Sequence, residues 1–196
     1  MYKFDDIEER IDKFLESLPC QSEISFPEVK VENKNLAYAD MLLDAYASSA
    51  DSEIQAITQY IYHSKTIGNK TISNALMCTA LIEMGHLDAL SEIISELGGK
   101  PAYYNSNRNF WMTGNIAYGD KNILNLKADE NAFTDKHTIR SKLENDIIGE
   151  ISAINGYKLL LSKIKDKYIQ RVIEKIISDE EVHISIFQEL IKRYLA

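Results

Sequence analysis

The sequence predicts an all-α fold, a four-helix bundle in which a long crossover joins two antiparallel helical hairpins behind a short N-terminal helix. Gly and Pro are scarce, with 8 and 3 among 196 residues. The prolines at 19, 27 and 101 lie outside the long periodic stretches, as a mostly helical chain requires. Four such stretches carry apolar residues at spacings of three and four, the pattern of helices with one buried face.

The N-terminal part is expected to contribute an amphipathic helix over residues 4–17. A polar, irregular segment follows, which lacks the alternation of a strand and is expected to lie over the bundle surface. We therefore divide the single domain into an N-terminal helix and surface segment, 1–34, and a bundle, 35–196.

The predicted bundle helices cover residues 35–66, 70–97, 136–163 and 166–194. Short connections within each pair indicate antiparallel hairpins. The connection over 99–135 is long enough to run the length of the bundle. Its aromatic residues are expected to pack onto the bundle or a partner subunit; they are Tyr103, Tyr104, Phe110, Trp111 and Tyr118.

Charge and composition exclude several classes of protein. A net charge of -8, from 22 basic and 30 acidic residues, argues against a nucleic-acid partner. No stretch is apolar for about 18 residues, so we expect no membrane span. Cys20 and Cys78 are too few and too far apart for a CxxC metal site and do not indicate a secreted disulfide scaffold. We expect a cytoplasmic protein that forms a homo-oligomer, a dimer or larger.

An internal repeat relates the two hairpins at an offset of 97 residues. The segment EIQAITQY at 53–60 matches EISAINGY at 150–157. The same offset relates Glu83 to Glu180 and His86 to His183. Repeated hairpins imply a pseudo-two-fold axis, so equivalent residues should face each other across the bundle centre.

Each half contains a Glu followed, 30 residues later, by a Glu-x-x-His motif. On a helix, residues three apart lie one turn apart on neighbouring faces and can reach one ion. Thirty residues is about the length needed to climb a helix, turn and return to the same height. Six side chains should therefore converge on two metal ions, iron or, alternatively, manganese. They are Glu53, Glu83, His86, Glu150, Glu180 and His183.

At these residues the sequence resembles the ferritin-like superfamily, in particular the rubrerythrin-like and manganese-catalase-like di-metal proteins. The resemblance covers residues 37–194 and implies that the six residues bind the ions, with Glu83 and Glu180 as bridges. A rubredoxin module with paired CxxC motifs is missing, so an electron donor would be a separate protein. Ala153 also stands where rubrerythrins carry an extra glutamate.

Residues beside the predicted site receive more modest interpretations. Asp179 is placed to accept a hydrogen bond from His86. Tyr60 and Tyr157 share the face of the ligands, and core packing is favoured over a phenol bonded to a ligand. Other residues are expected to have ordinary roles: His63 and His137 as partly exposed histidines, Glu92, Glu181 and Glu189 as surface charges, and Cys78 as a small buried apolar group.

Four functions fit this pattern. A rubrerythrin-like peroxidase or oxidase would reduce hydrogen peroxide or dioxygen with electrons from a separate donor protein. A dimanganese catalase would need no donor. Ferroxidase or iron-storage activity would require a hollow assembly. A structural, coat-type bundle would keep the metal for stability alone.

Overall fold

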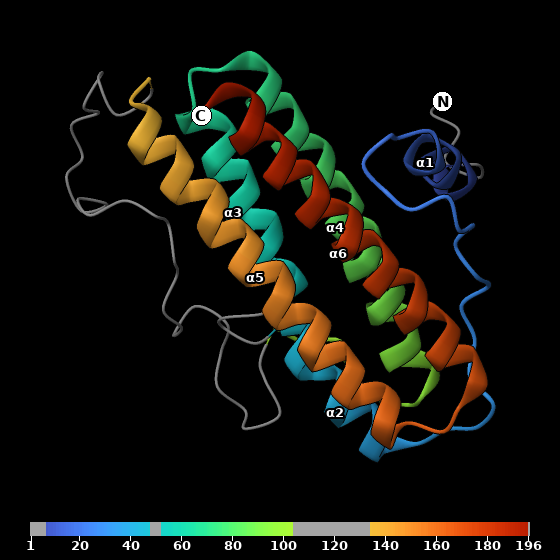
Figure 1. Cartoon of the computed structure of the whole chain (residues 1–196). Coiled ribbons are helices and arrows are strands. Elements are labelled where there is room, and N and C mark those ends of the chain that lie inside the picture. The colour runs from blue at the N-terminus through green and yellow to red at the C-terminus, as the bar shows by residue number, and fades with distance from the viewer. Residues whose placement is uncertain (1–6, 48–51, 104–133, 196) are drawn as a thin grey trace.

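The computed structural model describes residues 7–47, 52–103 and 134–195, which form six α-helices and no strand (Figure 1). Helix α1 spans Ile7–Glu16 and lies beside the bundle. Helix α2, Leu36–Ala47, packs across one end of it, against α3, α4 and α5. The predicted all-α bundle is confirmed.

Two antiparallel hairpins make up the bundle. Helix α3, Glu53–Thr66, pairs with α4, Lys70–Glu96, and α5, Lys136–Lys163, pairs with α6, Lys167–Tyr194. The side chains of Asn69, Asp135 and Asp166 cap α4, α5 and α6 by accepting bonds from backbone N–H groups of the first turn. Leu97 is the C-cap of α4, and Gly98 directly after it has a φ of 87°, a conformation that suits glycine. These boundaries lie within one residue of those predicted for the last three helices.

The single helix predicted over 35–66 is wrong. Two helices, α2 and α3, occupy this stretch, and α3 begins after Ser52. Ser52 has extended backbone angles and its side chain accepts a hydrogen bond from the Gln55 N–H, which makes it an N-cap. The apolar spacing in the sequence continues from one helix to the next, because both helices bury one face in the bundle. This spacing therefore does not reveal the break between them.

The apolar core has two clusters, one toward each end of the bundle. One contains Leu42, Leu90 and Val172, and the other contains Leu76 and Phe187. Along α4 and α6, the Glu-x-x-His motifs lie between the parts of the helix that enter each cluster. The candidate site is therefore a polar layer between two dry, well-packed regions.

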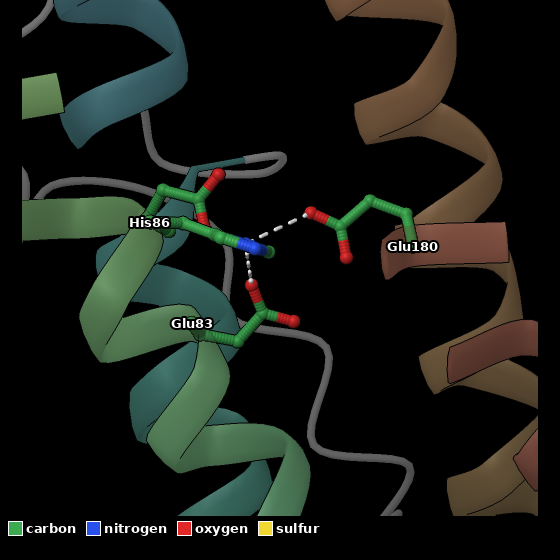
Figure 2. A group of neighbouring side chains, drawn as sticks. Glu83, His86 and Glu180 are labelled. Atoms are coloured by element: carbon green, nitrogen blue, oxygen red, sulfur yellow. Dashed lines mark hydrogen bonds and ion pairs between the residues drawn. The ribbon is translucent and has the colours of Figure 1, made fainter. Parts of the chain in front are cut away.

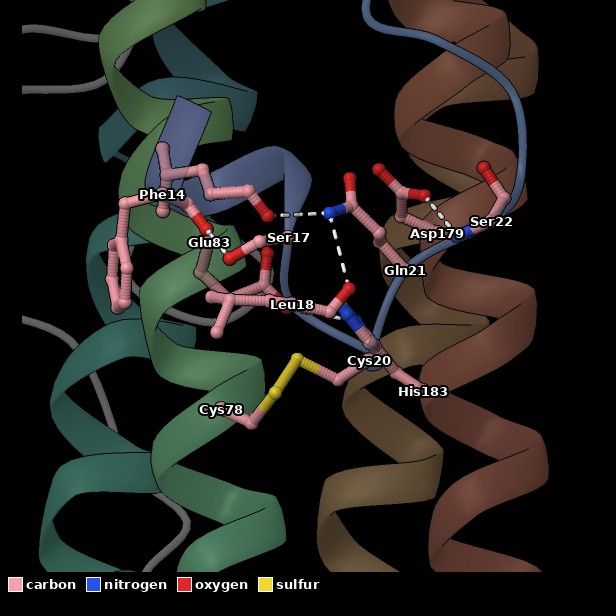
Figure 3. Close-up of a disulfide and its surroundings, with 11 residues drawn as sticks. Phe14, Ser17, Leu18, Cys20, Gln21, Ser22, Cys78, Glu83, Asp179 and His183 are labelled. Atoms are coloured by element: carbon pink, nitrogen blue, oxygen red, sulfur yellow. Dashed lines mark hydrogen bonds and ion pairs between the residues drawn. A yellow bond between two sulfur atoms is a disulfide. The ribbon is translucent and has the colours of Figure 1, made fainter. Parts of the chain in front are cut away.

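The segment 17–35, which we call the strap, crosses α4 and runs beside α6 (Figure 1). The Ser22 N–H donates to Asp179 Oδ1 at 2.7 Å, and the Glu32 N–H donates to Asp166 Oδ2 at 2.5 Å. A disulfide joins Cys20 to Cys78 of α4 (Figure 3). These contacts hold the strap against α4 and α6.

The disulfide corrects the interpretation of Cys78 as a free apolar side chain. The two cysteines are 58 residues apart in sequence, and their Cα atoms lie 6.1 Å apart in the fold. Sequence spacing could not reveal this contact, because the strap has no periodic pattern that fixes its position on the bundle.

Of the crossover, residues 104–133 lie outside the described part of the chain, and with them Tyr104, Phe110, Trp111 and Tyr118. Tyr103 stacks on Tyr46 with ring centroids 5.6 Å apart, in agreement with the predicted packing role. Within the described residues, none of the helices combines the length and apolar character needed to cross a membrane.

Candidate metal centre

The four long helices deliver the six predicted ligand residues to one buried layer. Glu53 comes from α3, Glu150 from α5, and the two Glu-x-x-His motifs from α4 and α6. All six side chains are buried. The internal repeat thus places equivalent residues around a common centre, as the pseudo-two-fold argument requires.

The residues fall into two groups that share Glu83 and Glu180. One group adds Glu53 and His86, and the other adds Glu150 and His183. Within each group, one ligand atom per residue lies within 4.8 Å of every other. Figure 2 shows Glu83 and Glu180 approaching the His86 ring from different helices. Two ion positions that share two carboxylates are the arrangement of a bridged pair.

His86 presents its Nδ1 atom to this layer. Glu83 Oε2 lies 2.9 Å from Nδ1 and Glu180 Oε1 lies 3.3 Å from it. The other ring nitrogen, Nε2, donates to Asp179 Oδ2 at 3.0 Å. A carboxylate behind an imidazole fixes the ring orientation and makes the free nitrogen more basic. The hydrogen bond expected from the sequence is therefore present, while the role of Asp179 toward a metal remains a prediction.

Asp179 is itself held firmly in place. Lys175 Nζ donates to both of its oxygens, at 2.6 and 2.8 Å, and the Ser22 N–H donates to Oδ1 (Figure 3). Burial disfavours its charged form, but the bonds from His86 and Lys175 outweigh this and lower the pKa of Asp179 to about 2. The Asp179 carboxylate is thus kept ionised, and it can accept a hydrogen bond from the Nε2–H group of His86.

His183 also presents Nδ1, which lies 2.7 Å from Glu180 Oε2 and 3.0 Å from Glu83 Oε1. Its Nε2 atom is buried and has no hydrogen-bond partner among the described residues. Both histidines therefore present Nδ1 to the centre, but only His86 has a hydrogen-bond partner at Nε2 among the described residues.

Two tyrosines bond to glutamates of the centre across the bundle. The Tyr60 hydroxyl donates to Glu150 Oε1, and the Tyr157 hydroxyl donates to Glu53 Oε1. Both phenols are almost fully buried. Core packing, the interpretation favoured from the sequence, is thus incomplete, because each phenol also holds one oxygen of a predicted ligand.

Electrostatics in the layer reflect the burial of many carboxylates together. Burial and the charge of neighbouring glutamates raise the pKa values of Glu53 and Glu150 well above the ordinary range. Burial opposes ionisation of Glu83 too, but the two imidazoles lower its pKa. Burial also disfavours charged histidine, yet the surrounding carboxylates raise the pKa values of His86 and His183.

The donor set fits a pair of divalent cations. Carboxylate oxygens and imidazole nitrogens suit iron and manganese, and both Cys side chains are engaged in the disulfide. The buried Glu83 Oε1 lacks a conventional hydrogen bond although it lies 3.0 Å from His183 Nδ1. Two cations would neutralise four carboxylates that are otherwise costly to bury.

A second buried polar network lies beside the centre, between α3 and α5. Gln55 Nε2 donates to Gln59 Oε1 at 3.2 Å, and Gln59 Nε2 donates to Asp146 Oδ1 at 2.8 Å. His63 Nδ1 lies 3.0 Å from Asp146 Oδ2. His63 is 0% exposed, so the expectation of a partly exposed histidine is wrong.

The network could have been noticed in the sequence from its spacing. Gln55, Gln59 and His63 are spaced four residues apart, which places them on one helical face, and Asp146 is one turn before Glu150. The internal repeat concealed it, since the network has no copy in the other half. His137, Glu92, Glu181 and Glu189 are exposed, as predicted.

Comparisons with known proteins support the fold. No family model matches the sequence. A Clostridium acetobutylicum protein named "Probable manganese catalase" is 22% identical over 170 residues, which cover 85% of this chain and 75% of that protein.

Among solved structures, KatB, a manganese catalase from Anabaena PCC7120, is similar with a TM-score of 0.70 and 20% identity, over 87% of this chain and 78% of that one. A bacterioferritin from Rhodobacter capsulatus has a TM-score of 0.60 and 22% identity, over 82% of this chain and 86% of that one. The chain therefore has the ferritin-like four-helix-bundle fold, with a buried carboxylate and histidine layer at its centre.

Proposed function

We propose that this protein is a dimanganese catalase, which converts two molecules of hydrogen peroxide into one dioxygen and two waters. The observation that carries the proposal is the pair of ligand groups sharing Glu83 and Glu180. Two ions held against each other can exchange two electrons with peroxide, the number that each half of the reaction requires. The similarity to a manganese catalase from Anabaena and to the Clostridium protein favours this reaction over the others.

The peroxidase interpretation, placed first from the sequence, has less support. The position of the extra rubrerythrin glutamate is occupied by Ala153, which is half-buried and lines a cavity at the centre. A methyl group there cannot serve as an alternative ligand. The site would then keep one ligand set through the cycle, as a catalase that alternates between oxidising and reducing peroxide requires.

The six residues would hold two manganese ions, which supply the redox chemistry when bound. The protein groups do the rest. Tyr60 fixes one oxygen of Glu150, and Tyr157 fixes one oxygen of Glu53, each by donating a hydrogen bond. Asp179 holds the His86 ring with Nδ1 toward the centre. The two apolar clusters on either side exclude bulk water.

Elemental analysis and an oxygen electrode test the proposal on the purified, manganese-loaded protein. We expect two manganese ions per chain and one dioxygen released per two peroxides consumed, without any reductant. The variant with Glu83→Ala and Glu180→Ala should lose both metal and oxygen release. Peroxide loss that requires a reductant and releases no oxygen would support a peroxidase instead. Bound metal without turnover would support storage or a structural role. The homo-oligomer stays a prediction, tested by light scattering.

A further inference from the structure

A cavity of about 240 Å³ lies between α3 and α5 and reaches the centre. Its inner wall contains the four glutamates of the site, and Ile148, which is 63% exposed, stands at its outer rim. Neither histidine lines it. The histidine side lies beneath the strap, where the Phe26 ring stacks on His86 with centroids 6.5 Å apart. The centre is thus covered on one side and open to a cavity on the other.

Small residues of both α3 and α5 line this cavity. Ala56, Gly149, Ser152 and Ala153 line it. A Cβ atom added at Gly149 would meet no atom within 4 Å, so the space beside this glycine is open. Small residues on two facing helices leave a passage that larger side chains would fill.

The orientation of the Gln55 amide follows from its network. Asp146 accepts, so the NH₂ group of Gln59 must face it, which turns the Gln59 carbonyl toward Gln55. The NH₂ group of Gln55 then donates to Gln59. This leaves Gln55 Oε1 as the atom that has no partner among the described residues, in a side chain that is 4% exposed and lines the cavity. A buried acceptor without a donor is unfavourable, so this oxygen would gain from a bound molecule that donates to it.

We propose that this cavity is the route by which hydrogen peroxide reaches the centre and that Gln55 positions it by accepting a hydrogen bond from its O–H group. This inference rests on the proposed catalase function for the identity of the ligand. Within the described residues no Lys, Arg or His lines the cavity, so it holds no cationic side chain that would select an anion over a small neutral molecule. Hydrogen-bond acceptors line the cavity, namely the Gln55 carbonyl and the glutamates, which suits a small neutral molecule with two O–H donors.

The route is tested by filling the cavity beside Gly149. In the metal-loaded protein, Gly149→Leu should lower kcat/KM for hydrogen peroxide by about tenfold or more. It should slow the association of azide, followed by the manganese absorption spectrum, by a similar factor. Gly156→Leu is the matched control, because Gly156 lies two turns along the same helix, also has open space at its Cβ and does not line the cavity.

The control should stay within about twofold of the natural protein in both measurements. If Gly149→Leu behaves like the control, with metal content unchanged, the cavity is not the route. If Gly149→Leu fails to fold or to hold metal, Ser152→Leu on the same wall replaces it, with the same expected losses. Azide association reports on the route even if the protein has no catalase activity, so failure of the proposed function and failure of the route are distinguishable.

The role of Gln55 is tested by Gln55→Met, which keeps the length of the side chain and removes the acceptor. We expect the KM for hydrogen peroxide to rise by about two- to tenfold, the worth of one hydrogen bond, while kcat and bound manganese change little. A purely structural role would lower metal content or stability and leave KM alone. An unchanged KM would overturn the assignment of Gln55.

Discussion

Replacing both cysteines, Cys20→Ala with Cys78→Ala, should lower the free energy of unfolding by about 4 kcal/mol. The disulfide closes a loop of 58 residues, and the loss of chain entropy in the unfolded state grows with the logarithm of loop length. Within the structure the change removes the two sulfur atoms and adds no polar group.

This loss is large compared with the whole stability of a typical domain, about 5–15 kcal/mol. Other contacts also hold the strap, among them the hydrogen bonds from Ser22 and Glu32 and the packing of Phe26, Val29 and Val31 against the core. Each hydrogen bond to a carboxylate is worth about 1.5–3 kcal/mol in net stability, less than the covalent link. We therefore expect the strap to be the first part of the fold to loosen in the variant.

Urea unfolding of the metal-free protein measures the effect without a contribution from bound ions. The natural protein should lose a similar amount of stability when a reductant is added, whereas the double variant should not respond to reductant. Maleimide should label no cysteine before reduction and two after it. A difference below about 1 kcal/mol between the oxidised and reduced protein, with the label counts as expected, would refute the loop-entropy reasoning.

Three further predictions concern the centre. Asp179→Asn should weaken manganese binding by about tenfold or more, measured by competition with a chelator, because the His86 ring loses its carboxylate partner. Metal affinity should rise with pH, since carboxylates raise the pKa of His86 and of His183 and these protons must leave; calorimetry in two buffers should detect proton release, and its absence would contradict the shifts. Tyr60→Phe should cost about 1–3 kcal/mol in thermal unfolding, because the buried Glu150 Oε1 loses its donor.

Much of the fold could be predicted because its helices are long, periodic and chemically capped. Helix α4 ends close to Gly98, and helices α5 and α6 begin directly after Asp135 and Asp166. The break before α3 is harder to predict from the sequence, because a serine N-cap within a polar stretch of small residues is a weak signal. The position of the strap depends on tertiary contacts alone, which no local pattern encodes.

The convergence of six side chains was predictable for a different reason. The two Glu-x-x-His motifs and their partner glutamates are related by one offset of 97 residues. A wrong assignment in one hairpin would therefore have had no matching residues in the other. The glutamine network lacked such support. Gln55 and Gln59 lie in only one half, and a polar residue on a helix is usually solvent-exposed. Only burial, known from the structure, distinguishes these amides from surface ones.

The strap explains why the two halves of the centre are not equivalent. At the offset of 97 residues, Asp179 corresponds to Ile82, which is 4% exposed and cannot accept a hydrogen bond. Lys175 corresponds to Cys78, and both of these positions hold the strap, one through hydrogen bonds to Gln21 and Ser22 and the other through the disulfide.

The sequence of the strap is not repeated at the offset of 97 residues, and the residues that meet it differ between α4 and α6. On α6 the result is a lysine and an aspartate that orient His86; on α4 it is a cysteine and an isoleucine, and His183 Nε2 has no partner among the described residues. The repeat alone would hold two ions alike. The segment outside the repeat would give an ion beside His86 the more basic and better oriented ligand, so we expect this position to bind metal more tightly.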